Sequence, residues 1–258
     1  MDHLQPLARC QALFLATAQR ADLETRVPWL GRWRVEQLVV HLARIHHWAA
    51  GQAQRRAEAP LGRGPFDVPR LYADCAAELR EVLASLDPDA PAWALIDDGV
   101  PRAAQRGTVR FWHRRQLHET LIHLWDLRTA LGEPLHDAEL GGAASEAGAA
   151  SAGIWLDCLE EVVTVMHPRQ LRLERVAPPP AALVFAPTGP GVGADASWTL
   201  TGAPVGAPTV TIAGPPRALA LLAWGRGVPE HDRLAADGVE VHGDRALAEE
   251  ILRAGITP

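Results

Sequence analysis

Glu119 and His123 lie four residues apart in the stretch from Arg110 to Leu131, and together they could hold a metal ion. In an α-helix, residues four apart are separated by about 40° around the axis, so both side chains lie on one face. A carboxylate oxygen and an imidazole nitrogen are typical ligands of a divalent ion such as zinc. The stretch therefore predicts part of a metal site.

The run from His118 to His123 is close to a zinc-peptidase motif, but it has one residue too many. Such peptidases carry HExxH, whereas this sequence has HExxxH. His118 and His123 diverge by about 140° on a straight helix, so they cannot both bind one ion from one face. We therefore set the peptidase interpretation aside and expect Glu119 to be a ligand rather than a general base.

Asp126 lies three residues beyond His123 and could orient its imidazole through a hydrogen bond. It could equally pair with Arg115 or Arg128, which lie on the same predicted helix. Charge pairs at helical spacing are common, so the acidic residues and His123 could also form only a solvated face beside these arginines. Spacing alone leaves both interpretations open.

The composition excludes several functions. The net charge of −6 gives no electrostatic basis for binding nucleic acid. No apolar run reaches the roughly 18 residues of a membrane span, and the N-terminus lacks the order of a signal peptide, so we expect a cytoplasmic protein. Cys10, Cys75 and Cys158 lie far apart without CxxC spacing and are expected to be buried free thiols. All basic residues are Arg, which excludes mechanisms that need Lys.

Helical periodicity predicts where these candidate ligands are placed. The predicted helices cover residues 3–21, 35–55, 71–86, 110–131 and 137–166. The first four suggest an antiparallel bundle, in which metal sites are built from side chains on facing helices. The second helix offers His41, on or beside its apolar face, while His46 and His47 are expected toward the surface or the rim. His41, Glu119 and His123 would supply the three protein ligands of a catalytic zinc site with one open position.

The composition changes after Pro168, where proline and glycine separate short segments of alternating polarity. Strands are predicted over residues 171–175, 181–186, 196–201 and 209–213, followed by helices over 215–224 and 245–254, the last with Asp244 as N-cap. We therefore predict two domains: a helical bundle with an extra helix over residues 1–167, and a small α+β domain over residues 168–258. The long irregular segment 87–107 is expected to cover a site in the first domain.

The segment HRRQLHETLIHLWDLRTALGEPL, which contains Glu119 and His123, resembles the signature R-R-x-x-H-E-T-x-x-H-x-x-D of the mycothiol-dependent maleylpyruvate isomerase family. PWLGRWRVEQLVVHLARIHHWA is similar to the Trp-containing connector and His-bearing second helix of that family. VTIAGPPRALALLAWGR and VEVHGD resemble its C-terminal domain, which is itself similar to sterol carrier proteins. The resemblance covers nearly the whole chain and implies a DinB-like metal-binding four-helix bundle followed by a sterol-carrier-like domain.

The resemblance also implies roles for individual residues. It assigns the metal ligands to His41, Glu119 and His123. It places an essential arginine of the C-terminal domain at Arg226, although this rests on a short motif and Arg226 could equally be a solvated loop cation. We take Arg226 and Asp126 as candidate catalytic residues, and Arg115 and Arg128 as candidates to bind the polar head of the thiol cofactor.

The implied cofactors are a divalent metal, for which we expect zinc although the sequence does not distinguish it from nickel or iron, and mycothiol as a thiol cosubstrate. A metal-bound thiolate would attack an electrophilic small molecule. In an isomerase, addition to a cis double bond allows rotation, and elimination returns the thiol. In a transferase, sulfur displaces a leaving group and stays attached. We favour the broader S-transferase, because nothing in the sequence selects a dicarboxylate substrate.

Two other functions remain open at this point. The same open metal site could activate water in a metal-dependent hydrolase. Alternatively, the chain could be a non-enzymatic small-molecule-binding module whose C-terminal domain holds an apolar ligand. Neither nucleic acid nor a membrane is an expected partner, and we expect a monomer or a small homo-oligomer.

Overall fold

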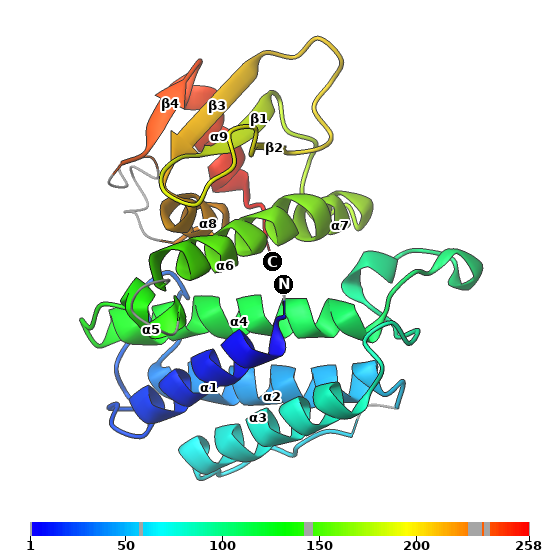
Figure 1. The fold of residues 1–258 in the computed structure, drawn as a ribbon, viewed down its shortest axis with the longest axis vertical. Coiled ribbons are helices and arrows are strands. Elements are labelled where there is room, and N and C mark those ends of the chain that lie inside the picture. Colours follow the sequence, from blue (N-terminus) through cyan, green and yellow to red (C-terminus); the bar gives the residue numbers. More distant parts are fainter. Residues whose placement is uncertain (1, 57–58, 142–146, 227–233, 235–237, 258) are drawn as a thin grey trace. The chain divides into compact units, whose positions relative to one another are not determined.

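The computed structural model describes residues 2–56, 59–141, 147–226, 234 and 238–257. The chain divides into two compact units, Met1–His136 and Asp137–Pro258. The first unit is helical, and the second combines helices with a four-stranded sheet (Figure 1). This is the predicted combination of a helical bundle with a small α+β domain.

The first unit is built on four long helices, which confirm the first four helices predicted from the periodicity of the sequence. They are α1 (Leu4–Ala18), α2 (Val35–Ala53), α3 (Val68–Ser85) and α4 (Val109–Ala130). Both α1 and α2 pack against α3 and α4, so each of the first two helices is covered from two sides. This packing buries apolar residues such as Leu7, Leu42 and Leu79 completely.

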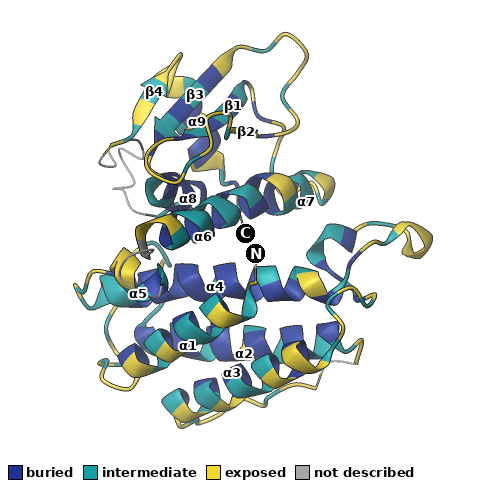
Figure 2. Ribbon diagram, viewed as in Figure 1, coloured by how far each residue is buried: buried dark blue, intermediate teal, exposed yellow. Residues whose placement is uncertain are grey.

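Helix α4 is the most deeply enclosed of these helices, and Figure 2 shows it buried along most of its length. Its buried polar side chains are His113, Arg115, Gln116, His118, Thr120, His123 and Asp126. Burying a polar group is costly unless it is hydrogen-bonded or paired. Because α4 buries so many polar side chains, the contacts between these groups help to determine its structure.

The segment between α3 and α4 is irregular, as predicted, and it is organised around one carboxylate. It contains two short 3₁₀-helices, Leu95–Asp97 and Arg102–Ala104. The buried Asp97 carboxylate accepts hydrogen bonds from the backbone N–H groups of Arg106 at 2.7 Å and Gly107 at 3.0 Å. These bonds hold the end of the segment against its first 3₁₀-helix. A role for the segment in covering a site stays a prediction.

The second unit begins with helices and continues into the sheet. Its elements are α5 (Asp137–Gly141), α6 (Ala147–Glu161), a π-helical turn (Val162–Met166), α7 (His167–Arg172), β1 (Ala182–Pro187), β2 (Trp198–Thr199), β3 (Thr209–Gly214), α8 (Pro216–Ala223), β4 (Glu240–His242) and α9 (Arg245–Ala254). The strand order is β2-β1-β3-β4, with a parallel central pair and antiparallel edges.

One face of this sheet carries the core of the second unit. Leu183 and Phe185 on β1 and Val210 and Ile212 on β3 are fully buried, while the residues between them are not. Helices α8 and α9 pack against β3, and α6 packs against α8. Asp244 caps α9 as predicted, because its carboxylate accepts the N–H of Ala246 at 2.9 Å.

Two predictions about the second unit were wrong. Residues 171–175 do not form a strand, and the helix does not end at His167-Pro168. Pro168 falls in the first turn of α7, where a missing N–H is tolerated, so the helix runs on to Arg172. The N–H of Arg175 then donates to the Gln170 carbonyl at 2.9 Å and closes the helix end. Strand β4 was not predicted.

The compact units differ from the domains expected from the sequence. The expected boundary lay between residues 167 and 168, whereas the structure groups α5, α6 and α7 with the sheet. The physical reason is that α6 packs on α8, so its apolar side chains are covered by the second unit. The family-based domain limits stay a prediction.

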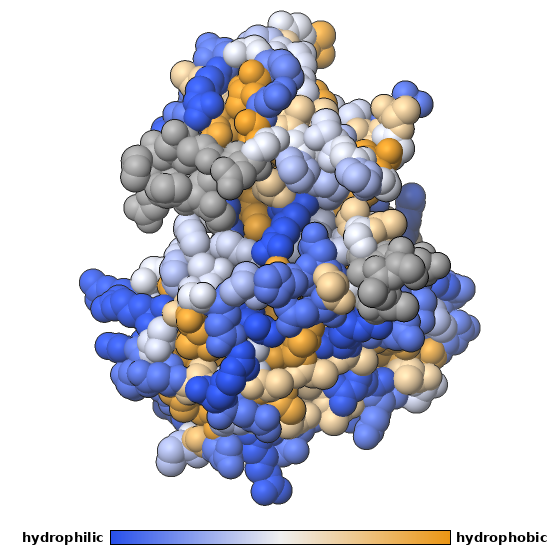
Figure 3. Space-filling model, turned by 60° about the vertical axis from the view of Figure 1, so that its left-hand side comes forward, coloured by the Kyte–Doolittle hydropathy of each residue, from blue (hydrophilic) through white to orange (hydrophobic). Residues whose placement is uncertain are grey.

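No helix among the described residues is long and apolar enough to cross a bilayer. On the face shown in Figure 3, hydrophilic side chains dominate the surface, with hydrophobic ones scattered between them. Scattered exposed hydrophobic residues are normal for folded proteins. The cysteines at positions 10, 75 and 158 are buried and form no disulfide, as expected.

Candidate metal centre

His41, Glu119 and His123 come together as predicted, with one ligand atom from each lying within 4.8 Å of the others. The Oε1 atom of Glu119 lies 3.4 Å from Nε2 of His41 and 3.2 Å from Nε2 of His123. Among the residues that the structure describes, no other three metal-ligating side chains gather in this way. The arrangement offers two imidazole nitrogens and one carboxylate oxygen around a common point.

The two helices that carry these residues run antiparallel. The ring of His41 on α2 lies 5.1 Å from that of His123 on α4, and Trp48, two turns further along α2, lies 5.1 Å from Trp112. Glu119 and His123 are one turn apart on α4 and share the face toward α2. Helix packing alone therefore brings the third side chain to the pair that the spacing predicted.

Asp126 fixes the orientation of the His123 ring. The Nδ1 atom of His123 donates to Oδ2 of Asp126 at 3.0 Å, and Asp126 is completely buried. A carboxylate on one imidazole nitrogen sets the tautomer and leaves the other nitrogen available as a ligand. The contact of Asp126 with His123 is therefore observed, while a catalytic role for Asp126 stays a prediction.

Arg115 holds Glu119 from the other side. Its Nη2 atom donates to Oε2 of Glu119 at 2.6 Å, and its side chain is only 3% exposed. Burial raises the pKa of the Glu119 carboxyl, but the Arg115 guanidinium and the two imidazoles outweigh burial and hold this pKa well below its usual range. Glu119 is therefore a carboxylate at neutral pH, as a metal ligand must be.

His123 lies between two carboxylates, those of Glu119 and Asp126. Burial lowers the pKa of His123, but the contacts with Asp126 and Glu119 outweigh it and raise the pKa to about 9. The surroundings of Nε2 thus favour a positive charge at this point. A divalent ion would supply that charge in place of the proton, so the donor set and its electrostatics fit such an ion.

The structure also gives contacts for two other residues that were predicted for the site. Arg128 pairs with Glu133 at 3.1 Å, just beyond the end of α4. Arg226 belongs to the second unit, where it follows α8 and donates to the Trp224 carbonyl at 2.6 Å. Roles for Arg115 and Arg128 in binding a cofactor, and for Arg226 in catalysis, stay predictions.

His118 lies apart from the cluster, as its spacing predicted. It is fully buried, and its ring lies 6.5 Å from that of His3, the residue just before α1. It therefore faces α1, while Glu119 and His123 face α2. The HExxxH run does not form a peptidase-like ligand pair.

The prediction that His46 lies toward the surface or the rim was wrong. His46 is completely buried and donates through Nδ1 to Oε1 of Gln116 at 2.8 Å. The error arises because α2 packs against both α3 and α4, so more than one of its faces is covered. His47 is only partly exposed, and its ring contacts Glu78 and the Ala59 carbonyl.

Trp33 is a neighbour of the cluster that the sequence did not single out. Its ring lies 4.9 Å from that of His41, from the connector that precedes α2. The available signal was the concentration of Trp, Pro and Gly in this connector, a composition that is typical of ordered, packed loops but indicates no particular contact.

These features define a helical bundle with a carboxylate–imidazole cluster between two helices, followed by an α+β unit. Family models match both parts: "Mycothiol maleylpyruvate isomerase N-terminal domain" over residues 4–128 and "MDMPI C-terminal domain" over residues 150–250. The chain therefore belongs to the mycothiol-dependent maleylpyruvate isomerase family.

Solved structures of the same fold agree with this assignment. A crystal structure of the mycothiol-dependent maleylpyruvate isomerase is 14% identical, with a TM-score of 0.60, and the match covers 93% of this chain and 91% of that one. A histidine-to-alanine mutant of that isomerase matches at 14% identity over the same shares of both chains, with a TM-score of 0.58. At this identity the likeness shows the fold. A search of curated proteins found no match.

Proposed function

We propose that this chain is a metal- and mycothiol-dependent enzyme that joins the thiol sulfur to an electrophilic carbon of a small molecule, as an S-transferase or an isomerase. The observation that carries the proposal is the cluster of His41, Glu119 and His123, whose ligand atoms lie within 4.8 Å of one another. The family supplies the expectation of mycothiol as the thiol.

A divalent ion in this cluster, for which we expect zinc, would lower the pKa of a thiol beside it and make the sulfur nucleophilic at neutral pH. The chain's own residues prepare the place for that chemistry. Asp126 aims Nε2 of His123 at the common point, and Arg115 keeps Glu119 ionised and in position. The burial of Asp126 and Arg115 keeps bulk water from screening these contacts.

Isomerisation and transfer begin with the same bond between sulfur and carbon. In transfer, the leaving group departs from the carbon with its electron pair, and the bond between sulfur and carbon remains. In isomerisation, the bond breaks again after rotation, and the thiol recovers its proton. The ligand cluster serves both outcomes, so product analysis decides between them. Sulfur retained in the product would identify a transferase, and an unchanged thiol with a rearranged electrophile would identify an isomerase.

The first test is metal content, measured by mass spectrometry of the purified protein. We expect about one equivalent of metal in the wild type and none in a folded triple variant, His41→Ala, Glu119→Ala and His123→Ala. His118→Asn is the matched control on the same helix and is expected to keep its metal. A wild type that stays metal-free after reconstitution, and that neither consumes mycothiol nor rearranges the electrophile in its presence, would overturn the proposal.

A further inference from the structure

A hollow of about 390 Å³ opens beside His41 within the first unit. Its walls come from three segments: the connector before α2, the exposed side of α2, and the segment that follows α2. The wall residues that matter here are Trp33, Glu36, Gln37, His41, Arg63 and Phe66. Because His41 belongs both to this hollow and to the ligand cluster, a molecule in the hollow lies next to the candidate metal centre.

Two aromatic rings line this hollow from opposite segments. Trp33 packs against the His41 ring at 4.9 Å, so its position is tied to that of the candidate ligand. Phe66 is held by Arg44, whose guanidinium lies 5.8 Å from the ring centroid. Arg44 also donates to the Gly62 carbonyl at 2.6 Å and so ties the segment after α2 to the helix. The aromatic walls are therefore anchored in place.

Polar side chains complete the lining with both kinds of hydrogen-bonding group. Arg63, an exposed residue, offers guanidinium donors, and Glu36, in the first turn of α2, offers carboxylate acceptors. Gln37 is already engaged through Oε1, which accepts the Arg34 N–H at 2.8 Å. Aromatic walls with a few donors and acceptors suit a ligand that is apolar on its ring faces and polar at its edges.

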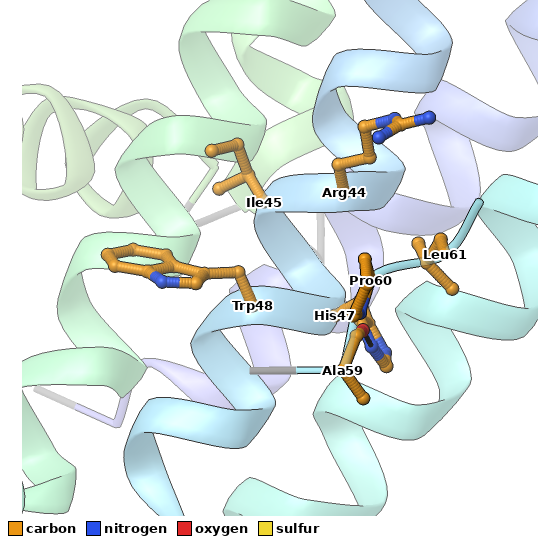
Figure 4. A pocket seen from close by; sticks show the side chains of 7 residues that line it. All are labelled: Arg44, Ile45, His47, Trp48, Ala59, Pro60 and Leu61. Atoms are coloured by element: carbon orange, nitrogen blue, oxygen red, sulfur yellow. Dashed lines mark hydrogen bonds between the residues drawn. The ribbon is translucent and has the colours of Figure 1, made fainter. Parts of the chain in front are cut away.

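A neighbouring hollow of about 340 Å³ along α2 differs in character (Figure 4). Ile45, Trp48, Pro60 and Leu61 give it mainly apolar walls. Its polar side chains, Arg44 and His47, are already hydrogen-bonded to carbonyl oxygens of the segment that covers it. The two hollows thus differ in the polar groups that they offer a ligand, and only the one beside His41 suits a polyhydroxylated group.

We propose that the hollow beside His41 binds a polyhydroxylated, sugar-like ring of the thiol cosubstrate, and this rests on the proposed function. A sugar ring has apolar C–H faces and a rim of hydroxyl groups, which match Trp33 and Phe66 on one hand and Arg63 and Glu36 on the other. Mycothiol carries its cysteinyl group on such a ring. With the ring seated here, the sulfur extends toward the cluster through the neighbourhood of His41.

The test measures binding without turnover, by calorimetric titration of S-methyl mycothiol, in which the sulfur is blocked. We expect Arg63→Ala and Trp33→Ala to weaken binding about tenfold each, which corresponds to about 1.4 kcal/mol. Leu61→Ala, in the neighbouring hollow, is the control and should bind as the wild type does. Metal content is measured for every variant, because Trp33 touches His41.

Equal affinities of the wild type, Arg63→Ala and Trp33→Ala for S-methyl mycothiol would overturn the inference, as would no binding by the wild type. A parallel titration with N-acetylcysteine, which lacks the ring, should be unaffected by Arg63→Ala. Should the wild type bind the blocked thiol in the expected pattern but turn over no electrophile, the proposed function would fail while the assignment of this hollow would stand.

Discussion

The Nδ1 atom of His123 lies 3.0 Å from Oδ2 of Asp126, and Asp126 is completely buried. This contact directs Nε2 of His123 toward Glu119 and the common point of the cluster. Asp126→Ala should therefore lower metal affinity by about 10- to 100-fold, because the imidazole loses its fixed orientation. Competition with a chromophoric chelator measures the change. Asp126→Asn, which keeps an acceptor oxygen, should recover part of the affinity, and an unchanged affinity in Asp126→Ala would contradict the role of this contact.

The buried pair of Arg115 and Glu119 makes a second prediction. Arg115→Met leaves the Glu119 carboxylate without its main partner in the bundle, which should cost about 3–5 kcal/mol of folding free energy in metal-free protein. A bound divalent ion would compensate the unpaired Glu119 charge, so adding metal should recover part of this loss. Urea unfolding with and without metal measures both values.

Arg70→Ala is the control for this experiment, because its pair with Asp74 is exposed and lies at 3.8 Å. Exposed pairs of this kind contribute little, so the change should stay within about 0.5 kcal/mol. If Arg115→Met changed the free energy of unfolding as little as Arg70→Ala does, Arg115 would not be the residue that holds Glu119 in place.

Much of this site follows from local rules, and the rest depends on packing between helices. The spacing of Glu119 and His123 places them on one face of any α-helix, whatever surrounds it. Whether that face meets solvent or α2 is decided by tertiary packing, which also buries Arg115. His46 shows the same limit, since a helix that is covered from two sides has no single apolar face to read.

The second unit shows a different limit. The alternation of residues 171–175 is compatible with a strand and equally with the last turn of a helix, and only packing distinguishes them. Strand β4 (Glu240–His242) is short and stays on the sheet through its pairing with β3 rather than through its own pattern. Short elements of this kind are determined by their partners.

His46 gives the bundle a dependence on acid. Burial lowers the pKa of His46 to about 4, against an ordinary value of 6.5, although the hydrogen bond to Gln116 opposes the shift. Between these two values the unfolded chain binds a proton that the folded chain does not, so stability falls as the pH falls. The loss from this group should reach about 3 kcal/mol.

Urea unfolding of the wild type and of His46→Leu at several pH values between 4 and 7 isolates this contribution. The variant should be less stable at neutral pH, because Gln116 loses its partner, but its stability should vary less with pH. His242→Leu, an exposed histidine, is the control and should follow the wild-type slope. If the free energy of unfolding depended on pH with the same slope in all three proteins, His46 would not be the source of the acid sensitivity.

His47 should act in the opposite direction on the segment that follows α2. Its Nδ1 lies 2.6 Å from the Glu78 carboxylate and its Nε2 lies 2.7 Å from the Ala59 carbonyl, and both partners only accept hydrogen bonds. Only the imidazolium can donate to both at once. Burial alone would lower the pKa of His47, but these hydrogen bonds and the Glu78 charge outweigh burial and the nearby Arg56, and they raise the pKa.

The raised pKa means that this contact is complete below the ordinary pKa of histidine and is lost as the pH rises through the folded value. Residues 59–66 should therefore exchange amide hydrogens faster at high pH than the intrinsic pH dependence of exchange explains. In His47→Gln, which donates to one partner at a time, this extra dependence should vanish. If the exchange of residues 59–66 depended on pH in the same way in the wild type and in His47→Gln, this role of His47 would be refuted. His242→Gln, at an exposed histidine, is the control.

Asp97 should carry much of the stability of the segment between α3 and α4. Its buried carboxylate accepts N–H groups of Arg106 at 2.7 Å and Gly107 at 3.0 Å. Asp97→Ala leaves the buried Gly107 N–H and the partly buried Arg106 N–H without their acceptor, which should cost about 3 kcal/mol in urea unfolding. Asp74→Ala, at an exposed acid, should cost less than about 0.5 kcal/mol. Because Gly107 leads directly into α4, the weakened contact should also appear as faster hydrogen exchange at the first turn of that helix. If Asp97→Ala lowered the free energy of unfolding as little as Asp74→Ala does, other contacts would hold the segment.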